Sequence, residues 1–400
     1  MTMELKSGYK QTEIGVIPMD WDIKKLNNLS EKIMVGIASA ATHAYRNSGV
    51  VLFRNQNIKS NYLDDRDILY VSEEYEQLFK GKRLKEGDLL TARTGYPGTT
   101  CIIPKKYEDS QSFTTLITRI KPKEIQIKFL CFYMNSEKGQ AFFESNQIGG
   151  GQKNVNAGTL KLMPIPIPSE KEQTAIATAL SDADGLITGL EKLIAKKRNL
   201  KQGAMQQLLQ PKEGWEVKKL GDVCDFYNGK GHEQSISENG NYIVVNSKFV
   251  STQGEVYKCS TENLFPLEKN DITIVMSDIP NGKALAKCFI IPEGNKYTLN
   301  QRIGAIRTNV LDYKFLYFIL NRNDYYLAFD SGTGQTNLKK NDILDCPVNL
   351  PPTKEEQTQI ATILSDMDAE LSALEQKLEK YKKIKLGMMQ ELLTGKTRLV

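Results

Sequence analysis

The chain has 400 residues, 40% of them hydrophobic, which is long enough for two or three domains with separate apolar cores. Its formal net charge of +5 is compatible with an anionic partner but too small to identify one. Apolar runs are too short to span a membrane, the first residues are too polar for a signal peptide, and the scattered cysteines and two histidines have no zinc-site spacing, so we expect a cytoplasmic protein without a metal site.

Residues 1–168 are predicted to form the first globular domain. The phrase Trp21–Leu26 is predicted to be its opening strand, and the stretch 129–143 has helical spacing. The aromatic residues of that stretch are expected in the core rather than as platforms for base stacking. They are Phe129, Phe132, Tyr133, Phe142 and Phe143.

Residues 169–210 are predicted to form one long helix. Pro168 precedes this segment and Pro211 follows it, where proline is compatible with a helix end but not with a helix interior. The apolar residues alternate in steps of four and three, which is the heptad spacing of a helix that packs against another helix. These seam residues are Ile176, Leu180, Ala183, Ile187, Leu190 and Ile194.

Residues 211–352 are predicted to form a second globular domain, and residues 353–400 a second long helix. The runs 242–245 and 271–276 have the composition of buried strands, and 313–329 has helical spacing. The heptad residues of the second helix are Ile360, Leu364, Met367, Leu371, Leu374, Leu378 and Tyr381. The predicted fold class is α/β (α+β), with two globular domains separated by two long coiled-coil helices.

The two long helices are copies of one another. Residues 172–209 match residues 356–393 without a gap, and nineteen of the 38 positions are identical. Such a long internal repeat indicates two structurally related units. We therefore expect the helices to pack antiparallel about a pseudo-twofold axis, the alternative being that each helix docks separately on its own domain. Further repeated phrases are Trp21–Leu26 with Trp215–Leu220, Lys128–Phe132 with Lys314–Phe318, and Gly151–Asn154 with Gly334–Asn337.

Lys201 and Lys385 occupy equivalent positions on the predicted helix seam. A lysine there can bury its stem and extend its ammonium group to water. Alternatively, it can be a polar determinant of a partner interface. The sequence favours neither interpretation.

Three phrases and their order resemble the specificity subunits of Type I restriction-modification systems. Residues 9–18 with Trp21 are similar to the opening of that family. Residues 164–168, followed by Glu172 and Gln173, are similar to its junction between domain and helix, and residues 392–398 to its ending. The resemblance covers essentially the whole chain, because two divergent domains alternate with two similar helices.

The resemblance implies a protein that binds double-stranded DNA and recognises an asymmetric bipartite site, one half with each domain. It implies that the helices set the spacer between the half-sites and dock two methyltransferase (modification) subunits, which restriction subunits then join. It implies no cofactor in this chain, because the partner subunits are expected to use S-adenosylmethionine, and ATP with Mg²⁺ for restriction. Two related DNA-binding domains arranged about a pseudo-twofold axis are consistent with the recognition of two half-sites.

Base recognition favours Arg or Lys for guanine, Asn or Gln for adenine, and Gly where the backbone approaches the duplex. Three pairs of equivalent loops supply these residues: 54–59 with 246–248, 93–99 with 277–283, and 152–154 with 335–337. The predicted DNA-binding residues are Arg54, Asn55, Asn57, Lys59, Arg93, Thr94, Gly95, Tyr96, Lys153, Asn246, Lys248, Ser277, Asn281, Lys283 and Thr336.

The first two pairs of loops differ most between the copies, as a base-recognition surface should. The third pair recurs closely, which suits phosphate contact or domain–helix packing better. The alternative for all three is that Asn and Gly only form turns. Arg54 and Arg93 are the leading candidates, because bidentate Arg–guanine pairs are the commonest specific contact.

The sequence carries no recognisable catalytic motif. Pro351-Pro352 lacks the flanking residues of a methyltransferase motif, and the segment around Gly395-Lys396-Thr397 lacks the first glycine of a P-loop. Asp20 and Asp22 are too close together for a metal-dependent nuclease. We therefore predict a non-catalytic subunit, with two alternatives: a coiled-coil scaffold with two protein-binding domains, or the specificity subunit of a fused restriction-modification enzyme.

Overall fold

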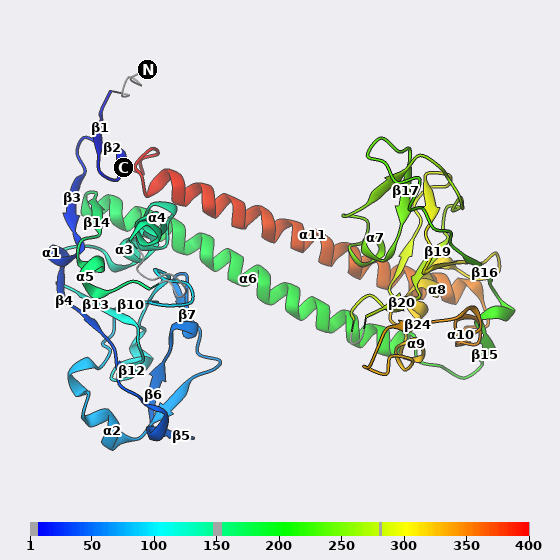
Figure 1. The fold of residues 1–400 in the computed structure, drawn as a ribbon, viewed down its shortest axis with the longest axis horizontal. Helices are drawn as coiled ribbons and strands as arrows, with labels where there is room; N and C mark the ends of the chain where they lie inside the picture. The colour runs from blue at the N-terminus through cyan, green and yellow to red at the C-terminus, as the bar shows by residue number, and fades with distance from the viewer. Residues whose placement is uncertain (1–6, 147–153, 280–281, 400) are drawn as a thin grey trace. The chain divides into compact units, whose positions relative to one another are not determined.

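The computed structural model describes residues 7–146, 154–279 and 282–399 (Figure 1). The chain divides into two compact units, one formed by Met1–Glu191 with Lys377–Val400 and the other by Lys192–Gln376. Two long helices, α6 (Glu170–Leu208) and α11 (Lys354–Leu392), each contribute one half to each unit. The helices therefore belong to the compact units, whereas the sequence divided the chain into four consecutive segments.

Both long helices begin as the sequence predicts, directly after the prolines. The hydroxyl of Ser169 accepts a hydrogen bond from the amide of Glu172 (3.2 Å), and the hydroxyl of Thr353 accepts one from the amide of Glu356 (3.2 Å). These bonds satisfy amide groups that the first turn of a helix leaves unpaired. Helix α6 ends at Leu208, three residues before Pro211.

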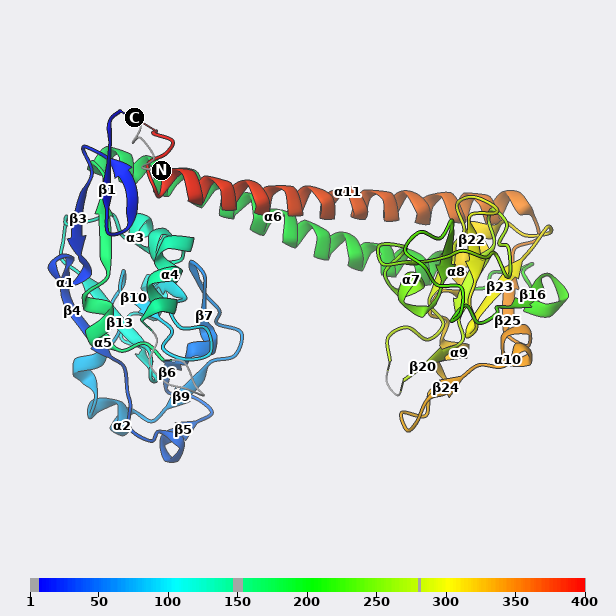
Figure 2. The same cartoon turned by 45° about the horizontal axis from the view of Figure 1, so that its top comes forward.

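The two helices run antiparallel in each unit, as predicted (Figures 1 and 2). Every predicted seam residue is buried or half-buried. In both units, the residue number of the ion-pair partner on α11 falls as the residue number on α6 rises, which is the pattern of antiparallel helices. These pairs are Asp184–Lys385 and Glu191–Lys382 in the first unit, and Arg198–Glu375 and Lys201–Asp368 in the second.

The globular part of the first unit contains two four-stranded sheets, ordered β11-β10-β13-β4 and β12-β6-β9-β5. The first sheet is antiparallel, and the second contains one parallel pair, β12 with β6. The strands are β1 (Tyr9–Thr12), β2 (Gly15–Pro18), β3 (Asp22–Lys25), β4 (Ser30–Val35), β5 (Tyr45–Arg46), β6 (Val50–Phe53), β7 (Ile58–Lys59), β8 (Tyr62–Leu63), β9 (Leu69–Val71), β10 (Leu89–Thr91), β11 (Thr100–Ile102), β12 (Gln111–Ser112), β13 (Leu116–Ile120) and β14 (Pro164–Ile167). The short helices are α1 (Leu26–Leu29), α2 (Glu73–Gln77), α3 (Ile127–Met134), α4 (Glu137–Ser145) and α5 (Ala157–Lys161).

The second unit repeats this topology with fewer strands. Its sheet β16-β23-β19-β21 has the same order as β4-β13-β10-β11, and the parallel pair β17–β22 corresponds to β6–β12. The strands are β15 (Glu216–Lys219), β16 (Asp225–Asn228), β17 (Tyr242–Val245), β18 (Lys258–Ser260), β19 (Ile272–Val275), β20 (Ser277–Asp278), β21 (Cys288–Ile290), β22 (Tyr297–Leu299), β23 (Ile303–Arg307), β24 (Thr336–Asn337) and β25 (Pro347–Leu350). The short helices are α7 (Ser247–Ser251), α8 (Tyr313–Leu320), α9 (Asp324–Leu327) and α10 (Lys340–Leu344).

The predicted strands 242–245 and 271–276 are present as β17 and β19. The two aromatic stretches, each predicted as helical, are each split into two helices, α3 with α4 and α8 with α9. Asn135 caps the end of α3, and Ser136 caps the start of α4, because its hydroxyl accepts from the amide of Gly139 at 3.2 Å. The aromatic side chains are in the core as expected, with Phe129, Phe132, Tyr133 and Phe143 buried and Phe142 partly buried.

The ends of the long helices are part of the domain cores. In the first unit, Ile176 and Leu180 of α6 and Leu393 beyond α11 lie in the core cluster that contains Phe129. In the second unit, Ile360 and Leu364 of α11 share a core with Phe315 of α8. The two arrangements that the sequence left open therefore coexist, because each helix packs on a domain and also on the other helix. No helix in the described part of the chain is both long and apolar enough to cross a membrane.

Candidate nucleic-acid interface

In the first unit, the structure brings the first two predicted loops together, next to Val155, which directly follows the third. The hairpin 93–99 joins β10 to β11, and its Arg93 amide donates to the side-chain oxygen of Asn55 at 2.8 Å. The Nε atom of Arg93 donates to the carbonyl of Val155 at 3.3 Å, directly after the third loop. The first two loops, which are distant in sequence, are thus hydrogen-bonded to each other and to Val155.

The two arginines favoured by the sequence have different surroundings. The Nη2 atom of Arg54 lies 2.9 Å from the Asp67 carboxylate, which also accepts from Gln56 at 2.7 Å. Among the described residues, the two terminal nitrogens of Arg93 have no partner, and only its Nε is bonded. The terminal nitrogens of Arg93 can therefore bind a ligand directly, whereas Arg54 must first lose its ion pair with Asp67.

Asn57 supports the first loop from inside the domain. Its side chain accepts from the amide of Arg54 (2.8 Å) and donates to the carbonyls of Asp64 (3.0 Å) and Asp67 (2.7 Å). The residue is only 2% exposed. We therefore leave Asn57 out of the DNA-facing set, because its polar atoms are already used and a ligand has no access to them.

The tip of the hairpin 93–99 presents an aromatic side chain to solvent. Tyr96 is 84% exposed, and Thr94 beside it is half-buried. Gly95 has a φ of +79° and open space around it, so a close approach by another backbone is sterically possible. A Cβ on Gly98 would lie 2.3 Å from the Phe143 ring, so this glycine is required for packing.

In the second unit, the second and third predicted loops come together. Strand β20 pairs with β24, and the side chain of Gln335 donates to the Ser277 hydroxyl at 2.6 Å. Ser277 and Thr336 are buried in this contact, whereas Lys283 is exposed. Ser277 and Thr336 thus hold the loops together, and Lys283 remains as the predicted residue that faces solvent.

The first loop of the second unit follows β17, as the Arg54 loop follows β6. The Asn246 side chain caps α7 by accepting from the amide of Phe249 at 2.9 Å, and Lys248 is exposed on the first turn. In the first unit, Lys59 is half-buried on β7 and pairs with Tyr62 on β8. Lys153 and Asn281 lie outside the described residues.

The sequence analysis did not identify Tyr62, which is exposed on the β7–β8 hairpin beside the first loop. The signal was the pair Ser60-Asn61 between two short strands. Asn61 has a φ of +67°, which asparagine tolerates better than most residues and which suits a two-residue hairpin turn. The hairpin turns Tyr62 outward on the strand that returns from the loop.

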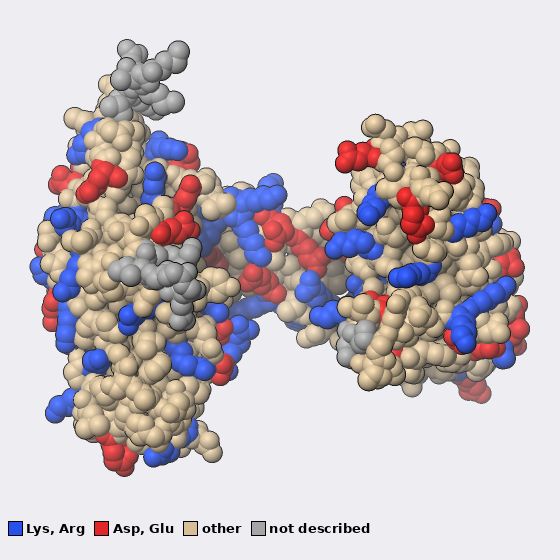
Figure 3. Space-filling model, viewed as in Figure 1, with Lys and Arg blue, Asp and Glu red and all other residues tan. Residues whose placement is uncertain are grey.

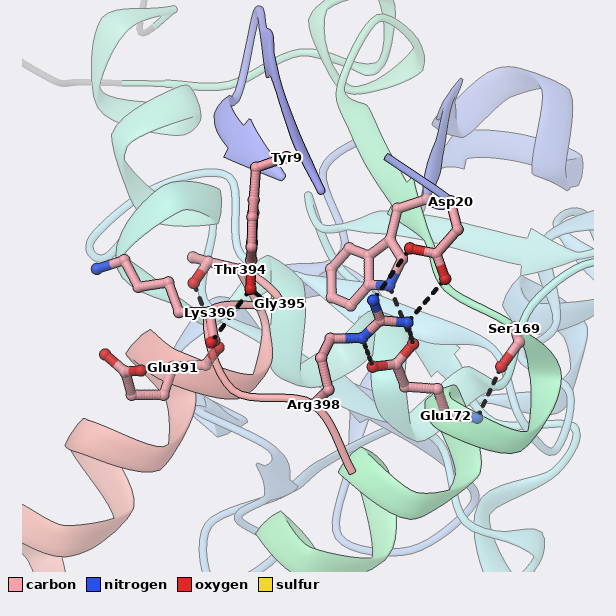
Figure 4. Close-up of polar contacts among 10 residues, drawn as sticks. Tyr9, Asp20, Ser169, Glu172, Glu391, Thr394, Gly395, Lys396 and Arg398 are labelled. Atoms are coloured by element: carbon pink, nitrogen blue, oxygen red, sulfur yellow. Dashed lines mark hydrogen bonds and ion pairs between the residues drawn. The ribbon is translucent and has the colours of Figure 1, made fainter. Parts of the chain in front are cut away.

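The chain's C-terminal residues dock on the first unit through Arg398 (Figure 4). Its guanidinium group lies 2.5 Å from Glu172 and 2.8 Å from Asp20, and the Trp21 indole donates to Glu172 at 3.0 Å. The Glu172 side chain is fully buried. The hydrogen bonds from Arg398 lower the pKa of the Asp20 carboxyl below its usual value.

The second unit contains the same Trp–Glu pair, with Trp215 Nε1 at 3.3 Å from Glu356. There α6 ends at Leu208 and the chain continues through the non-helical residues 210–214 directly into Trp215, so a covalent connection replaces the Arg398 contact. At the repeat offset, residues 394–398 align with residues 210–214. This alignment was the signal that the tail would return to the start of the first domain, and the sequence analysis did not use it.

Metal-binding chemistry finds no support in the described ranges, where no group of three His, Cys, Asp or Glu side chains could hold an ion. His232 is buried, and its ring nitrogens lie 2.8 Å from the Lys230 carbonyl and 2.8 Å from the Thr298 hydroxyl. Its polar atoms are thus used within the domain.

Comparisons with known proteins match both halves of the chain to one family. Residues 18–201 and residues 212–385 each match the Type I restriction modification DNA specificity domain. The MjaIX specificity subunit of a Type I restriction enzyme from Methanocaldococcus jannaschii is 23% identical, over 98% of this chain and 96% of its own length. The MjaVIII specificity subunit from the same organism is 27% identical over 72% and 74%. A solved Type I restriction-modification S subunit from M. genitalium has a similar fold, with a TM-score of 0.61, 17% identity and coverage of 93% of this chain and 96% of that one.

Proposed function

The chain belongs to the Type I restriction modification DNA specificity family, and from this premise we propose that each globular part recognises one half of a bipartite DNA site. The observation that carries the proposal is the duplication: each half matches the family separately, and the first two loops predicted to recognise bases follow equivalent strands in the two halves. Because these loops differ between the halves, the two half-sites should differ and the whole site should be asymmetric.

Recognition in the first unit is assigned to the exposed or half-buried side chains of the converged loops, chiefly Arg93, Tyr96 and Lys59. In the second unit it is assigned to Lys248 and Lys283. Positive and negative side chains are interspersed over the face drawn in Figure 3, so no broad basic surface marks a DNA track there. Specificity therefore has to come from particular loop residues rather than from overall charge.

Replacing Arg93 with Ala should relax specificity at one base pair. Loss of a bidentate contact to guanine should cost about 1–3 kcal/mol for the preferred base and leave other positions of the site unchanged. The measurement is binding of the assembled methyltransferase complex to a library of single-base site variants. The Arg93→Lys variant is the matched control, because it keeps the charge but loses the planar fork.

If Arg93→Ala weakened binding equally for all sequences while Arg93→Lys kept most of the affinity, Arg93 would be a phosphate contact. If neither variant changed binding, the hairpin 93–99 would not face DNA at all.

We propose that two methyltransferase subunits dock on the long helices. Each unit exposes large apolar side chains on its helical stretches, among them Ile384 on α11 in the first unit and Leu200 on α6 in the second. These two residues occupy equivalent positions of the repeat, so they provide two equivalent apolar contacts for two copies of one partner. An apolar helix face on the partner subunit is the complementary surface.

Replacing Leu200 and Ile384 with Ser should weaken assembly. Each side chain that a partner buries contributes about 1.5 kcal/mol or more, so affinity for each methyltransferase subunit should fall about tenfold. The measurement is titration of the purified chain with the methyltransferase, followed by mass photometry. Leu78→Ser with Leu162→Ser is the control, because these leucines are exposed on the globular part of the first unit. Equal affinity in both double variants would contradict the docking proposal.

The chemistry is assigned to the partner subunits. We propose that the chain contributes DNA recognition without a catalytic group, and that it works in the cytoplasm. The methyltransferase subunits would bring S-adenosylmethionine, and the restriction subunits ATP and Mg²⁺. The family's description as a DNA specificity domain supports this division of roles.

Methylome sequencing tests the proposed function most directly. Cells that express this chain with its neighbouring methyltransferase should acquire methylation at one asymmetric motif with two half-sites and a fixed gap. Methylation without a bipartite motif, or methylation that persists when this chain is deleted, would contradict the proposal.

A further inference from the structure

The two seam lysines form contacts within the chain that the sequence did not suggest. In the second unit, Lys201 of α6 forms an ion pair with Asp368 of α11. Its ammonium nitrogen also lies 5.5 Å from the centre of the Phe318 ring on α8. The Lys201 side chain is 20% exposed, so its charged end is held between protein groups rather than extended freely into water.

The first unit contains the same arrangement. Lys385 of α11 lies 2.5 Å from Asp184 of α6, and its ammonium nitrogen is 5.7 Å from the centre of the Phe132 ring on α3. Its side chain is 16% exposed. All three members of the contact are equivalent in the repeat, the lysines and aspartates through the helix copies and the phenylalanines through the phrases 128–132 and 314–318.

Among the residues that the structure describes, the cations of the other ion pairs between the two helices have no aromatic ring of a globular domain beside them. Lys197, which lies 2.6 Å from Glu370 on α11, is more exposed than Lys201, at 30%. The Lys–Asp–Phe contact therefore differs in kind, because it joins both long helices to a helix of the globular domain. It also lies next to an open cavity of about 700 Å³ in the second unit, lined by Phe318 and Asp368 among others, where apolar packing is incomplete.

The chemistry of the contact is suited to fixing an angle. Apolar seam contacts are non-directional, so leucine and isoleucine side chains can re-form them after a small rotation of the domain. A charged hydrogen bond and a cation over a ring face both depend on direction. A polar residue at a seam position is a known means of selecting one register among several apolar ones.

We propose that the two Lys–Asp–Phe contacts are orientation locks. Each one fixes the angle at which a globular domain sits on its own stretch of the helix pair, and thereby restricts the spacer lengths that the protein accepts between DNA half-sites. The proposal rests on the proposed function, because it concerns the spacing of a bipartite site. It assigns spacer discrimination to Lys201, Asp368, Lys385 and Asp184, none of which is placed at the DNA.

The test uses the complete methyltransferase complex and a DNA library with fixed half-sites and spacers from two base pairs shorter to two longer than the native one. The tested variant is Lys201→Met with Lys385→Met, which keeps side-chain length and removes the charge. Methylation at spacers one base pair from the native length should rise about tenfold relative to the native spacer, as expected for the loss of a charge-assisted hydrogen bond. The half-site bases should not change.

A second variant guards against misfolding of the first. Asp184→Asn with Asp368→Asn removes the opposite charges at positions that are more exposed, and it should give the same relaxation. Lys197→Met is the control and should keep the native spacer preference. An unchanged spacer preference in both double variants, or the same relaxation in the control, would overturn the orientation locks. If the unmodified complex had no spacer preference, the proposed function itself would fail.

Discussion

Inserting four residues into each long helix should give a DNA spacer about two base pairs longer than the native one. An α-helix rises 1.5 Å per residue, so four residues add about 6 Å to α6, and adjacent base pairs are about 3.4 Å apart. The insertion sites are after Glu191 in α6 and after Gln376 in α11, which are the boundaries between the two compact units along the chain. Inserting into both helices preserves their antiparallel pairing in each unit.

Methylome sequencing of cells that carry the insertion variant measures the new spacer directly. Both half-sites should keep their bases, because no loop residue changes. The same four residues inserted after Gly294 are the control, since this turn between β21 and β22 is exposed and away from the long helices. A variant that remains active with the native spacer would show that the helices do not set the gap.

Replacing Arg398 with Ala should destabilise the first unit by about 2–3 kcal/mol. The change leaves the fully buried Glu172 carboxylate without its cation, and breaking one partner of a buried pair is costly because the other charge stays desolvated. The lower end of that cost applies because Arg398 is itself 31% exposed. The effect should be confined to the first unit, since the corresponding carboxylate of the second unit belongs to Glu356.

Hydrogen exchange measured by mass spectrometry resolves the two units, which a single unfolding midpoint would not. Exchange should accelerate in residues 9–18 and 170–180 and stay unchanged in residues 215–360. Lys396→Ala is the matched control, because it removes a charge from the same tail at an exposed position. Adding Glu172→Gln to Arg398→Ala should recover part of the lost protection. Unchanged protection in the Arg398 variant would mean that the tail does not hold the unit together.

The candidate interface shows how far residue types alone can be interpreted. The sequence placed three loops in each half, and in the structure the first loops follow the equivalent strands β6 and β17, and the second follow β10 and β19. Which residues face a ligand depended on contacts with distant residues. Asn57 was predicted to contact DNA, but its side chain is hydrogen-bonded to backbone carbonyls of Asp64 and Asp67. Arg54 forms an ion pair with Asp67. The DNA-facing roles of Arg93, Tyr96, Lys248 and Lys283 remain predictions.

By itself, the sequence determined the repeat, the two long helices, their heptad seam and the family. Those properties are periodic or local, so they follow from the spacing of residues along one chain. Only the tertiary structure decided that the tail closes on Glu172 through Arg398, and that Lys201 and Lys385 join helix to domain. Both contacts pair a charge with a partner more than a hundred residues away, and no local pattern encodes such a distance. The physical reason is that the free energy of a buried charge depends on the groups around it, and only folding brings those groups together.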